Sequence, residues 1–257
     1  MNIEKIRQGT RGNIGREILF YPVIDSTNTA GLEKALTSEE GLVILADSQL
    51  KGKGRLGRTW VSPPGLNIYM SIVLKPLIEL ADATLITITS AVACSIALRN
   101  ISGLEITIKW PNDLMFQNRK IGGILTELKS ELKKIVFAVV GIGINVNSEL
   151  KDFPEDIRRM ATSLRNETKK SFSRTEIIIE LLNELNKWYA VLASDREIII
   201  DKWKELSSTI GRKVKVVSGQ ETLEGIAEDI NEKGMLILKL LTGEQKKIVS
   251  GDLIVLS

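Results

Sequence analysis

Apolar runs of strand length recur along the first 150 residues of the chain, each bounded by charged or turn-forming residues. A continuous apolar run of about four to eight residues is typical of a buried strand. Candidate strands of this kind lie at 41–47, 66–74, 105–110, 120–128 and 134–147. The earlier stretch "VIDSTNTAGLEKAL" predicts a strand end that runs into a helix, with Asp25 or Ser26 as the cap.

In several segments between and after these strands, apolar residues recur with the period of a helix. It predicts a helix over 81–100, an amphipathic helix that ends near Leu192 and a third helix over 195–206. Ser173 followed by Glu176 is a capping-box pattern, so the second helix is expected to begin after Ser173. The combination predicts an α+β fold in which a mixed β-sheet is flanked by helices.

After Gly211 the pattern changes to short alternating strands separated by turn residues. The strand candidates are "RKVKVV", "ETLEGIAEDI", "GMLILKLL" and "QKKIVSGDLIVLS". This pattern predicts a small carboxy-terminal all-β barrel. We therefore expect one large domain over residues 1–208 and a small β-barrel domain over residues 209–257.

The composition removes several classes of chemistry. The chain of 257 residues contains no histidine, which excludes Ser-His and Cys-His catalysis and histidine-metal sites. Its one cysteine, Cys94, lies in "SAVACSIAL", which predicts a buried helix face and an inert thiol. Any reaction must therefore rely on lysine, arginine, carboxylates, amides and the backbone, or on a substrate that ATP activates.

Further patterns bear on location and on partners. The stretch "MNIEKIRQGTRG" lacks the apolar block of a secretory signal, and the longest uncharged run, 83–98, is short and contains threonine and serine. We expect a cytoplasmic protein that does not enter a membrane. About 20 residues precede the first strand, fewer than a helix-turn-helix module needs, so we expect no specific binding to DNA.

The stretch "KGKGRLGR", residues 51–58, places four cations and three glycines within eight residues. No acid occurs between Asp47 and Glu79 to balance them. Glycines let a backbone approach a ligand closely and point its N–H groups inward, so the loop suits an anion with several oxygens. The alternative is a solvated basic loop without a ligand, and the Walker spacing of a phosphate-binding loop is absent.

A second polar group lies in "KWPNDL", residues 109–114. Pro111 favours an extended Trp110, so Asn112 and Asp113 are expected just past the end of a strand. Amide and carboxylate groups placed there bind a nucleotide, or a metal and its waters. An Asx turn that enters a hairpin is an equal alternative.

Lys120 begins the apolar strand "KIGGIL". A two-residue turn at 118–119 would place Asp113 opposite Ile124 and on the same face as Lys120. The two rungs would then be about 13 Å apart, so no direct Asp113–Lys120 ion pair is expected. A solvated lysine at a sheet edge is the alternative interpretation. The glycines of "GIGINVN", residues 141–147, indicate a close approach by a ligand or by another strand.

Taken together, five motifs in this order resemble the biotin protein ligase family. They are "DSTN" (25–28), "GKGRLGRTW" (52–60), "KWPNDL" (109–114), "KIGGIL" (120–125) and "GIGINVN" (141–147). The carboxy-terminal strands are similar to that family's small barrel, so the resemblance covers nearly the whole chain. It implies a catalytic domain for biotin and ATP over residues 1–208, in a monofunctional enzyme without an amino-terminal DNA-binding domain.

The resemblance also implies a two-step reaction. Biotin and ATP give biotinyl-5′-AMP and pyrophosphate, and a lysine of a biotin carboxyl carrier domain then takes the biotinyl group and releases AMP. Joining a carboxylate to a phosphate brings two anions together, so preorganised cations and N–H donors lower the barrier without a histidine. The family further implies a homodimer.

By position, the resemblance assigns two overlapping sets of site residues. The biotin set is Ser26, Thr27, Asn28, Gln49, Lys53, Gly54, Arg55 and Lys120. The ATP set is Arg55, Arg58, Trp60, Lys109, Asn112, Lys120 and Asn145. Lys120 and Arg55 are implied to be catalytic, and the metal ligands stay open, with Asp113 as a candidate that acts through magnesium. Lys53 departs from the family's usual arginine and offers no planar two-pronged contact.

Two other functions can be weighed against this resemblance. Lipoate-attaching ligases share the catalytic fold, but their arginine, serine and glycine motif with a histidine has no match in this chain. An RNA-binding module would also combine a basic loop with a small barrel. Nucleic-acid sites usually interleave aromatic residues with cations, and residues 51–58 contain none.

Overall fold

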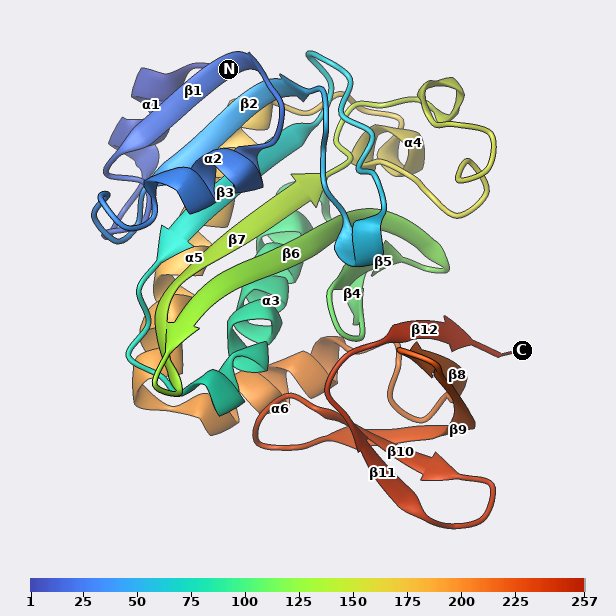
Figure 1. Ribbon diagram of the computed structural model, residues 1–257. Coiled ribbons are helices and arrows are strands. Elements are labelled where there is room, and N and C mark those ends of the chain that lie inside the picture. The colour runs from blue at the N-terminus through green and yellow to red at the C-terminus, as the bar shows by residue number, and fades with distance from the viewer. Residues whose placement is uncertain (257) are drawn as a thin grey trace.

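The computed structural model describes residues 1–256, which form two β-sheets and a set of helices that cover the larger sheet (Figure 1). The larger sheet has seven strands in the order β1-β2-β3-β7-β6-β5-β4. β1 and β2 are parallel, and the other neighbouring strands are antiparallel, so the predicted mixed sheet is confirmed. The strands are β1 (Ile18–Ile24), β2 (Val43–Gln49), β3 (Ile68–Leu74), β4 (Ile106–Lys109), β5 (Asp113–Phe116), β6 (Arg119–Glu131) and β7 (Lys134–Ile144).

Helices lie on both faces of this sheet, and α3 and α5 cover the face opposite α2 (Figure 1). Alternation along β2 explains the two faces, because Val43 and Leu45 pack toward the larger core whereas Ile44 packs with Ala30 of α2. The helices are α1 (Ile3–Gly9), α2 (Thr27–Lys34), α3 (Thr84–Ser102), α4 (Leu164–Thr168), α5 (Arg174–Ser194) and α6 (Arg196–Leu206). Short 3-10 turns are η1 (Arg55–Gly57), η2 (Leu80–Asp82) and η3 (Leu150–Asp152).

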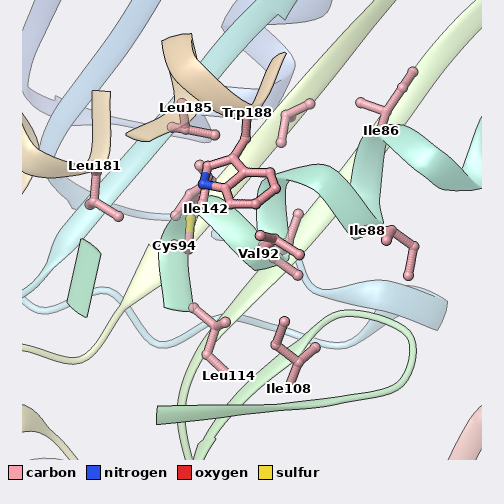
Figure 2. Close-up of a cluster of buried hydrophobic side chains, with 14 of the residues drawn as sticks. Ile86, Ile88, Val92, Cys94, Ile108, Leu114, Ile142, Leu181, Leu185 and Trp188 are labelled. Carbon is pink, nitrogen blue, oxygen red and sulfur yellow. The ribbon is translucent and has the colours of Figure 1, made fainter. Parts of the chain in front are cut away.

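The larger core is centred on α3, as Figure 2 shows. Val92 and Cys94 of α3 lie among Leu185 and Trp188 of α5 and Ile142 of β7, and all five are buried. The predicted burial of Cys94 is confirmed, and burial raises the pKa of its thiol, so the group stays protonated and unreactive. Truncating one such buried side chain to alanine typically costs about 2–5 kcal/mol.

The segment Leu80–Ser102, which contains α3, is long and apolar enough to cross a membrane by length and composition alone. In the fold, 67% of its most apolar window is buried inside the protein. Contact with the sheet on one side and with α5 on the other accounts for its apolar character.

The second sheet contains the carboxy-terminal strands in the order β11-β10-β9-β8-β12. All its pairings are antiparallel, and the strands are β8 (Lys213–Ser218), β9 (Glu221–Ile230), β10 (Leu236–Leu240), β11 (Gln245–Ile248) and β12 (Asp252–Val255). The predicted all-β unit is confirmed. Within residues 1–256, β11 and β12 are its two edges, so the barrel is open. The division after residue 208 stays a prediction.

Trp110 links the two sheets. Its backbone N–H donates to Thr209 Oγ1 at 2.9 Å, and its indole Nε1 donates to Gly234 O at 3.2 Å. The side chain is 1% exposed, so this aromatic residue is packed between β4 and the turn that precedes β10. The second sheet is thereby held beside the ends of β4 and β5, where the charged motifs of the sequence meet (Figure 1).

Candidate active site

The start of α2 presents polar residues that the sequence predicts for ligand binding. Ser26 is the N-cap, and its hydroxyl accepts a hydrogen bond from the Thr29 backbone N–H. The backbone N–H and the hydroxyl of Thr27 both donate to Gln49 Oε1, at 2.8 and 3.1 Å. Gln49 is the last residue of β2, so these bonds fix the helix start against the end of that strand.

Asn28 extends this network onto the face of the sheet. Its Oδ1 lies 2.6 Å from the hydroxyl of Ser71, and its Nδ2 donates to Glu127 Oε2 at 2.9 Å and to Leu125 O at 3.3 Å. Gly141 leaves room for the amide, because a Cβ there would lie 2.1 Å from Asn28 Oδ1. Asn28 and Ser71 are buried, and such oriented groups suit recognition of a polar, uncharged ring.

The basic loop, residues 51–58, leaves β2 and crosses toward β5 and β6 (Figure 1). Lys53 and Thr59 form an isolated antiparallel bridge, and the Gly54 N–H donates to Arg58 O at 2.7 Å. These bonds make the loop a compact turn.

Arg55 and Arg58 extend from this loop to other parts of the chain. Arg55 Nη1 donates to Asn112 Oδ1 at 2.8 Å, and Arg55 Nη2 donates to Gly251 O at 3.3 Å. Arg58 forms an ion pair with Asp252, the first residue of β12. The second sheet therefore touches the loop that the sequence assigns to anion binding.

Trp60 follows the loop and lies flat against the sheet over two glycines. A Cβ at Gly143 would lie 2.5 Å from Trp60 Cε2, and a Cβ at Gly123 would lie 3.5 Å from Trp60 Cζ3. Gly123 and Gly143 are paired on β6 and β7, so the missing side chains let the indole approach the backbone. Lys120 Nζ lies 5.6 Å from the ring centroid, within cation–π range.

Asp113 lies between two lysines. Its Oδ1 is 2.5 Å from Lys120 Nζ, and its Oδ2 is 3.4 Å from Lys109 Nζ. Burial alone raises the pKa of Asp113, but the two lysines outweigh burial and hold the pKa below its usual value. Burial lowers the pKa of Arg55, whereas the nearby Asp113 favours its charged form. Arg55, Lys109 and Lys120 thus share this carboxylate, which leaves an excess of positive charge.

The expected separation of Asp113 from Lys120 is wrong. The two-residue turn falls at 117–118, one residue earlier than the sequence predicts. Across this turn Phe116 pairs with Arg119 and Met115 with Lys120, and a bulge beyond that pair sets Asp113 opposite Gly123. Lys120 is then two residues from the level of Asp113 instead of four, a gap that a lysine side chain spans.

The two asparagines assigned to the nucleotide lie at strand ends. Asn112 occupies the turn of the hairpin between β4 and β5, and its Nδ2 donates to Ile124 O at 2.7 Å. Asn145 follows β7, and its backbone N–H donates to Ile121 O at 2.8 Å. Both side chains are buried, 6% and 5% exposed. Asn112 therefore joins the Arg55 cluster through a fixed amide.

The cluster does not fit a directly bound magnesium ion. Magnesium prefers several oxygen ligands in octahedral geometry. Each oxygen of Asp113 faces an ammonium group, and residues 1–256 contain no group of three histidine, cysteine or acidic side chains suited to a metal. The role of Asp113 through magnesium stays a prediction.

The structure adds polar residues that the sequence analysis missed. Ser71 is fully buried between Thr27 and Asn28, and the only signal for it is one hydroxyl within the apolar run "IYMSIVL". Ser62 accepts from Gln49 Nε2 and donates to Trp60 O, which ties the polar network to the loop. Nothing in the local pattern distinguishes Ser62 from a solvated loop serine.

Comparisons with known proteins agree with this geometry. Residues 20–145 match the biotin/lipoate A/B protein ligase family, and residues 209–256 match the biotin protein ligase C-terminal domain. The bifunctional ligase/repressor BirA of Bacillus subtilis is 32% identical over 252 residues, which cover 97% of this chain and 77% of that protein. The biotin–[acetyl-CoA-carboxylase] ligase of Mycobacterium tuberculosis is 30% identical over 253 residues, covering 95% and 90% of the two chains.

Solved structures give the same result. The biotin protein ligase of Aquifex aeolicus, in complex with biotin and ATP, superposes with a TM-score of 0.79 at 30% identity. The match covers 93% of this chain and 98% of that one. The two proteins therefore share one fold over nearly the full length of both chains. The chain belongs to the biotin protein ligase family.

Proposed function

We propose that this chain activates biotin with ATP to form biotinyl-5′-AMP and then transfers the biotinyl group to a lysine of a biotin carboxyl carrier domain. One observation carries the proposal beyond family membership. A buried polar network around Asn28, which is uncharged overall because Lys53 balances the Glu127 carboxylate, lies on the same sheet as a cluster with excess positive charge around Lys120. Such a pair of surfaces suits a ligand with a polar ring at one end and a carboxylate that must meet a phosphate.

The uncharged end would bind the ring system of biotin. Ser26, Thr27, Asn28 and Gln49 supply the donors and acceptors, and their mutual hydrogen bonds fix the direction of each group. Gly54, Lys53 and Arg55 of the basic loop would cover the carboxylate-bearing side chain of biotin. A site of fixed hydrogen-bonding groups rejects analogues that leave those groups unpaired.

The charged end would bind ATP. Arg55, Arg58 and Lys109 would face its phosphates, Trp60 would pack near the adenine, and Asn112 and Asn145 would hold the nucleotide from the strand ends. Lys120 would lie between the carboxylate of biotin and the α-phosphate. Its contact with Asp113, at 2.5 Å, holds the ammonium group in place before either anion arrives.

In the first step, a carboxylate oxygen of biotin attacks the α-phosphorus, and the bond from that phosphorus to the pyrophosphate oxygen breaks. Negative charge increases on the phosphoryl oxygens as the two anions approach, and Lys120 and Arg55 stabilise it. Magnesium would accompany the phosphates of ATP, and within residues 1–256 no group of three histidine, cysteine or acidic side chains could hold it directly. No side chain needs to remove a proton in this step.

In the second step, the neutral amine of the carrier lysine attacks the acyl carbon of biotinyl-5′-AMP. The bond from that carbon to the phosphate oxygen breaks, AMP leaves, and the nitrogen releases a proton to solvent. The closed basic loop would keep water from the acyl-phosphate until the carrier lysine enters.

The family resemblance alone supports three further proposals. Residues 1–208 would form the catalytic domain and residues 209–257 the small domain, the enzyme would be a homodimer, and it would act in the cytoplasm. Sedimentation equilibrium with and without biotin and ATP checks the dimer.

The function is tested by pyrophosphate exchange into ATP and by mass spectrometry of a carrier domain. We expect exchange that requires biotin, and a carrier mass that increases by one biotinyl group at one lysine. Lipoate in place of biotin serves as the matched control. Exchange without biotin, or equal exchange with lipoate, would contradict the proposal.

A further inference from the structure

Glu127 of β6 contacts both the polar network and the basic loop. Its Oε2 accepts from Asn28 Nδ2 at 2.9 Å, and its Oε1 lies 3.8 Å from Lys53 Nζ. Its side chain is 31% exposed, and that of Lys53 is 42% exposed. Glu127 therefore connects Asn28, which is assigned to the biotin ring, with Lys53 of the loop that would cover the carboxylate of biotin.

On the network side, Glu127 determines which way the Asn28 amide points. Nδ2 has two acceptors, Glu127 Oε2 and Leu125 O, whereas Oδ1 faces the hydroxyl of Ser71. A rotated amide would place its oxygen against both acceptors, which is repulsive. Glu127 and Leu125 are alternate residues of β6, so the strand itself holds this geometry.

On the loop side, Glu127 faces the first arm of the turn. Lys53 enters the turn at its bridge to Thr59, whereas Arg58 leaves the turn and pairs with Asp252 of β12. Acids from two different sheets thus hold the loop at Lys53 and at Arg58, and Asp25 pairs with Lys51 at its start. Lys53 reaches the acid beside Asn28, and the second arm reaches the acid of the carboxy-terminal sheet.

We propose that Glu127 is a positioning residue that couples the orientation of Asn28 to closure of the basic loop through Lys53. The proposal rests on the proposed function. When Lys53 pairs with Glu127, the loop stays closed and the Asn28 amide keeps its direction toward the ligand. When the loop opens, Glu127 loses its cation, so ligand binding at Asn28 and retention of the acyl-adenylate share one contact.

The test compares Glu127→Gln, Lys53→Met and the double variant. The glutamine side chain of the first variant would keep an acceptor for Asn28 but lose the charge that attracts Lys53. We expect each single variant to release biotinyl-5′-AMP about two- to fivefold faster, the range for an ion pair of this exposure, and the double variant to show no further increase. Glu127→Ala should raise the KM for biotin more than Glu127→Gln does, because Asn28 also loses an acceptor.

A matched control is Glu131→Gln, which removes the Lys129–Glu131 pair of 3.0 Å on the same strand but away from the loop. Equal release by Glu131→Gln and Glu127→Gln, or additive effects in the double variant, would overturn the coupling.

A second readout needs no catalysis. Tryptic cleavage after Arg55 in the free protein should be about two- to fivefold faster in Glu127→Gln than in the wild type or Glu131→Gln. Absence of biotin-dependent exchange in the wild type would reject the proposed function, whereas equal cleavage in all three proteins would reject the role of Glu127.

Discussion

The two halves of the candidate site differ in how their polar and charged groups are balanced. Around Asn28 the chain satisfies its own polar groups, because Ser71, Gln49 and Glu127 already complete a hydrogen-bond network. Around Lys120 the cations exceed the carboxylate that they share, so charge balance there requires an anion from outside. The first half is built to orient a ligand, and the second half is built to react with one.

This comparison predicts that a change in the charged half impairs formation or retention of the activated intermediate, whereas a change in the uncharged half lowers the affinity for biotin. The variants below test that division, from the largest expected effect to the smallest.

Lys120→Ala should reduce biotin-dependent pyrophosphate exchange by about 10²–10³-fold, because loss of one positioned donor to developing charge typically has that effect. Far-ultraviolet circular dichroism should show a folded protein. The control is Lys129→Ala, which removes a half-exposed lysine of the same strand. Near-normal exchange by Lys120→Ala would remove this lysine from the reaction.

Arg55→Gly should release the activated intermediate, because the variant loses the bonds to Asn112 and Gly251 that hold the loop. Loss of a charge-assisted hydrogen bond predicts an increase of about tenfold in biotin on lysines of a bystander protein. Lys51→Gly, at an exposed cation of the same loop, is the control. If neither variant labels the bystander, the loop does not retain the intermediate.

Ser71→Ala should raise the KM for biotin about fivefold, since one buried hydrogen bond contributes about 1 kcal/mol. The KM for ATP should change much less, because Ser71 contacts only the uncharged half. Ser90→Ala is the control, since that buried hydroxyl bonds only within α3. Equal increases in both KM values would contradict the separation of the two halves.

The pH dependence of unfolding tests the charged half without substrate. Lys120 and Lys109 hold the pKa of Asp113 below its unfolded value, so Asp113 stabilises the fold above about pH 4 and this contribution is lost as the pH falls through the folded pKa. Between pH 7 and pH 3, the free energy of unfolding should therefore fall by about 1 kcal/mol more in the wild type than in Asp113→Asn.

Urea titrations at each pH measure this difference. Asp229→Asn, at the half-exposed pair with Lys204, is the control and should follow the wild type. A steeper acid loss in Asp113→Asn than in the wild type would mean that the carboxylate is not stabilised by its lysines.

The sequence predicts the central strands of the sheet well because they are buried on both faces. β3 and β7 are apolar at nearly every position, and such runs identify a strand without knowledge of its neighbours. The capped starts of α2 and α5 are equally local, since Ser26 and Ser173 each accept from a backbone N–H three residues later. These elements depend on interactions within a few residues.

The distance between Asp113 and Lys120 could not be predicted in the same way. It depends on a turn that begins at Gln117, which has a positive φ of 53° although it is not glycine and which sets Met115 opposite Lys120. A register shift of this kind arises from packing across strands, and no local pattern marks it. The same holds for Glu127, whose partners Asn28 and Lys53 lie far away in the sequence.

The glycines beneath the site limit how it could be re-engineered. At Gly141 and Gly143 the side chains of Asn28 and Trp60 already rest on bare backbone and fill the space that a methyl group would need. No deletion at these positions can deepen the candidate site, and any added side chain displaces a residue assigned to binding. Space for a bulkier biotin analogue must therefore come from smaller side chains at the border of the site. The residues of α2 and of the basic loop are the first candidates for such substitutions.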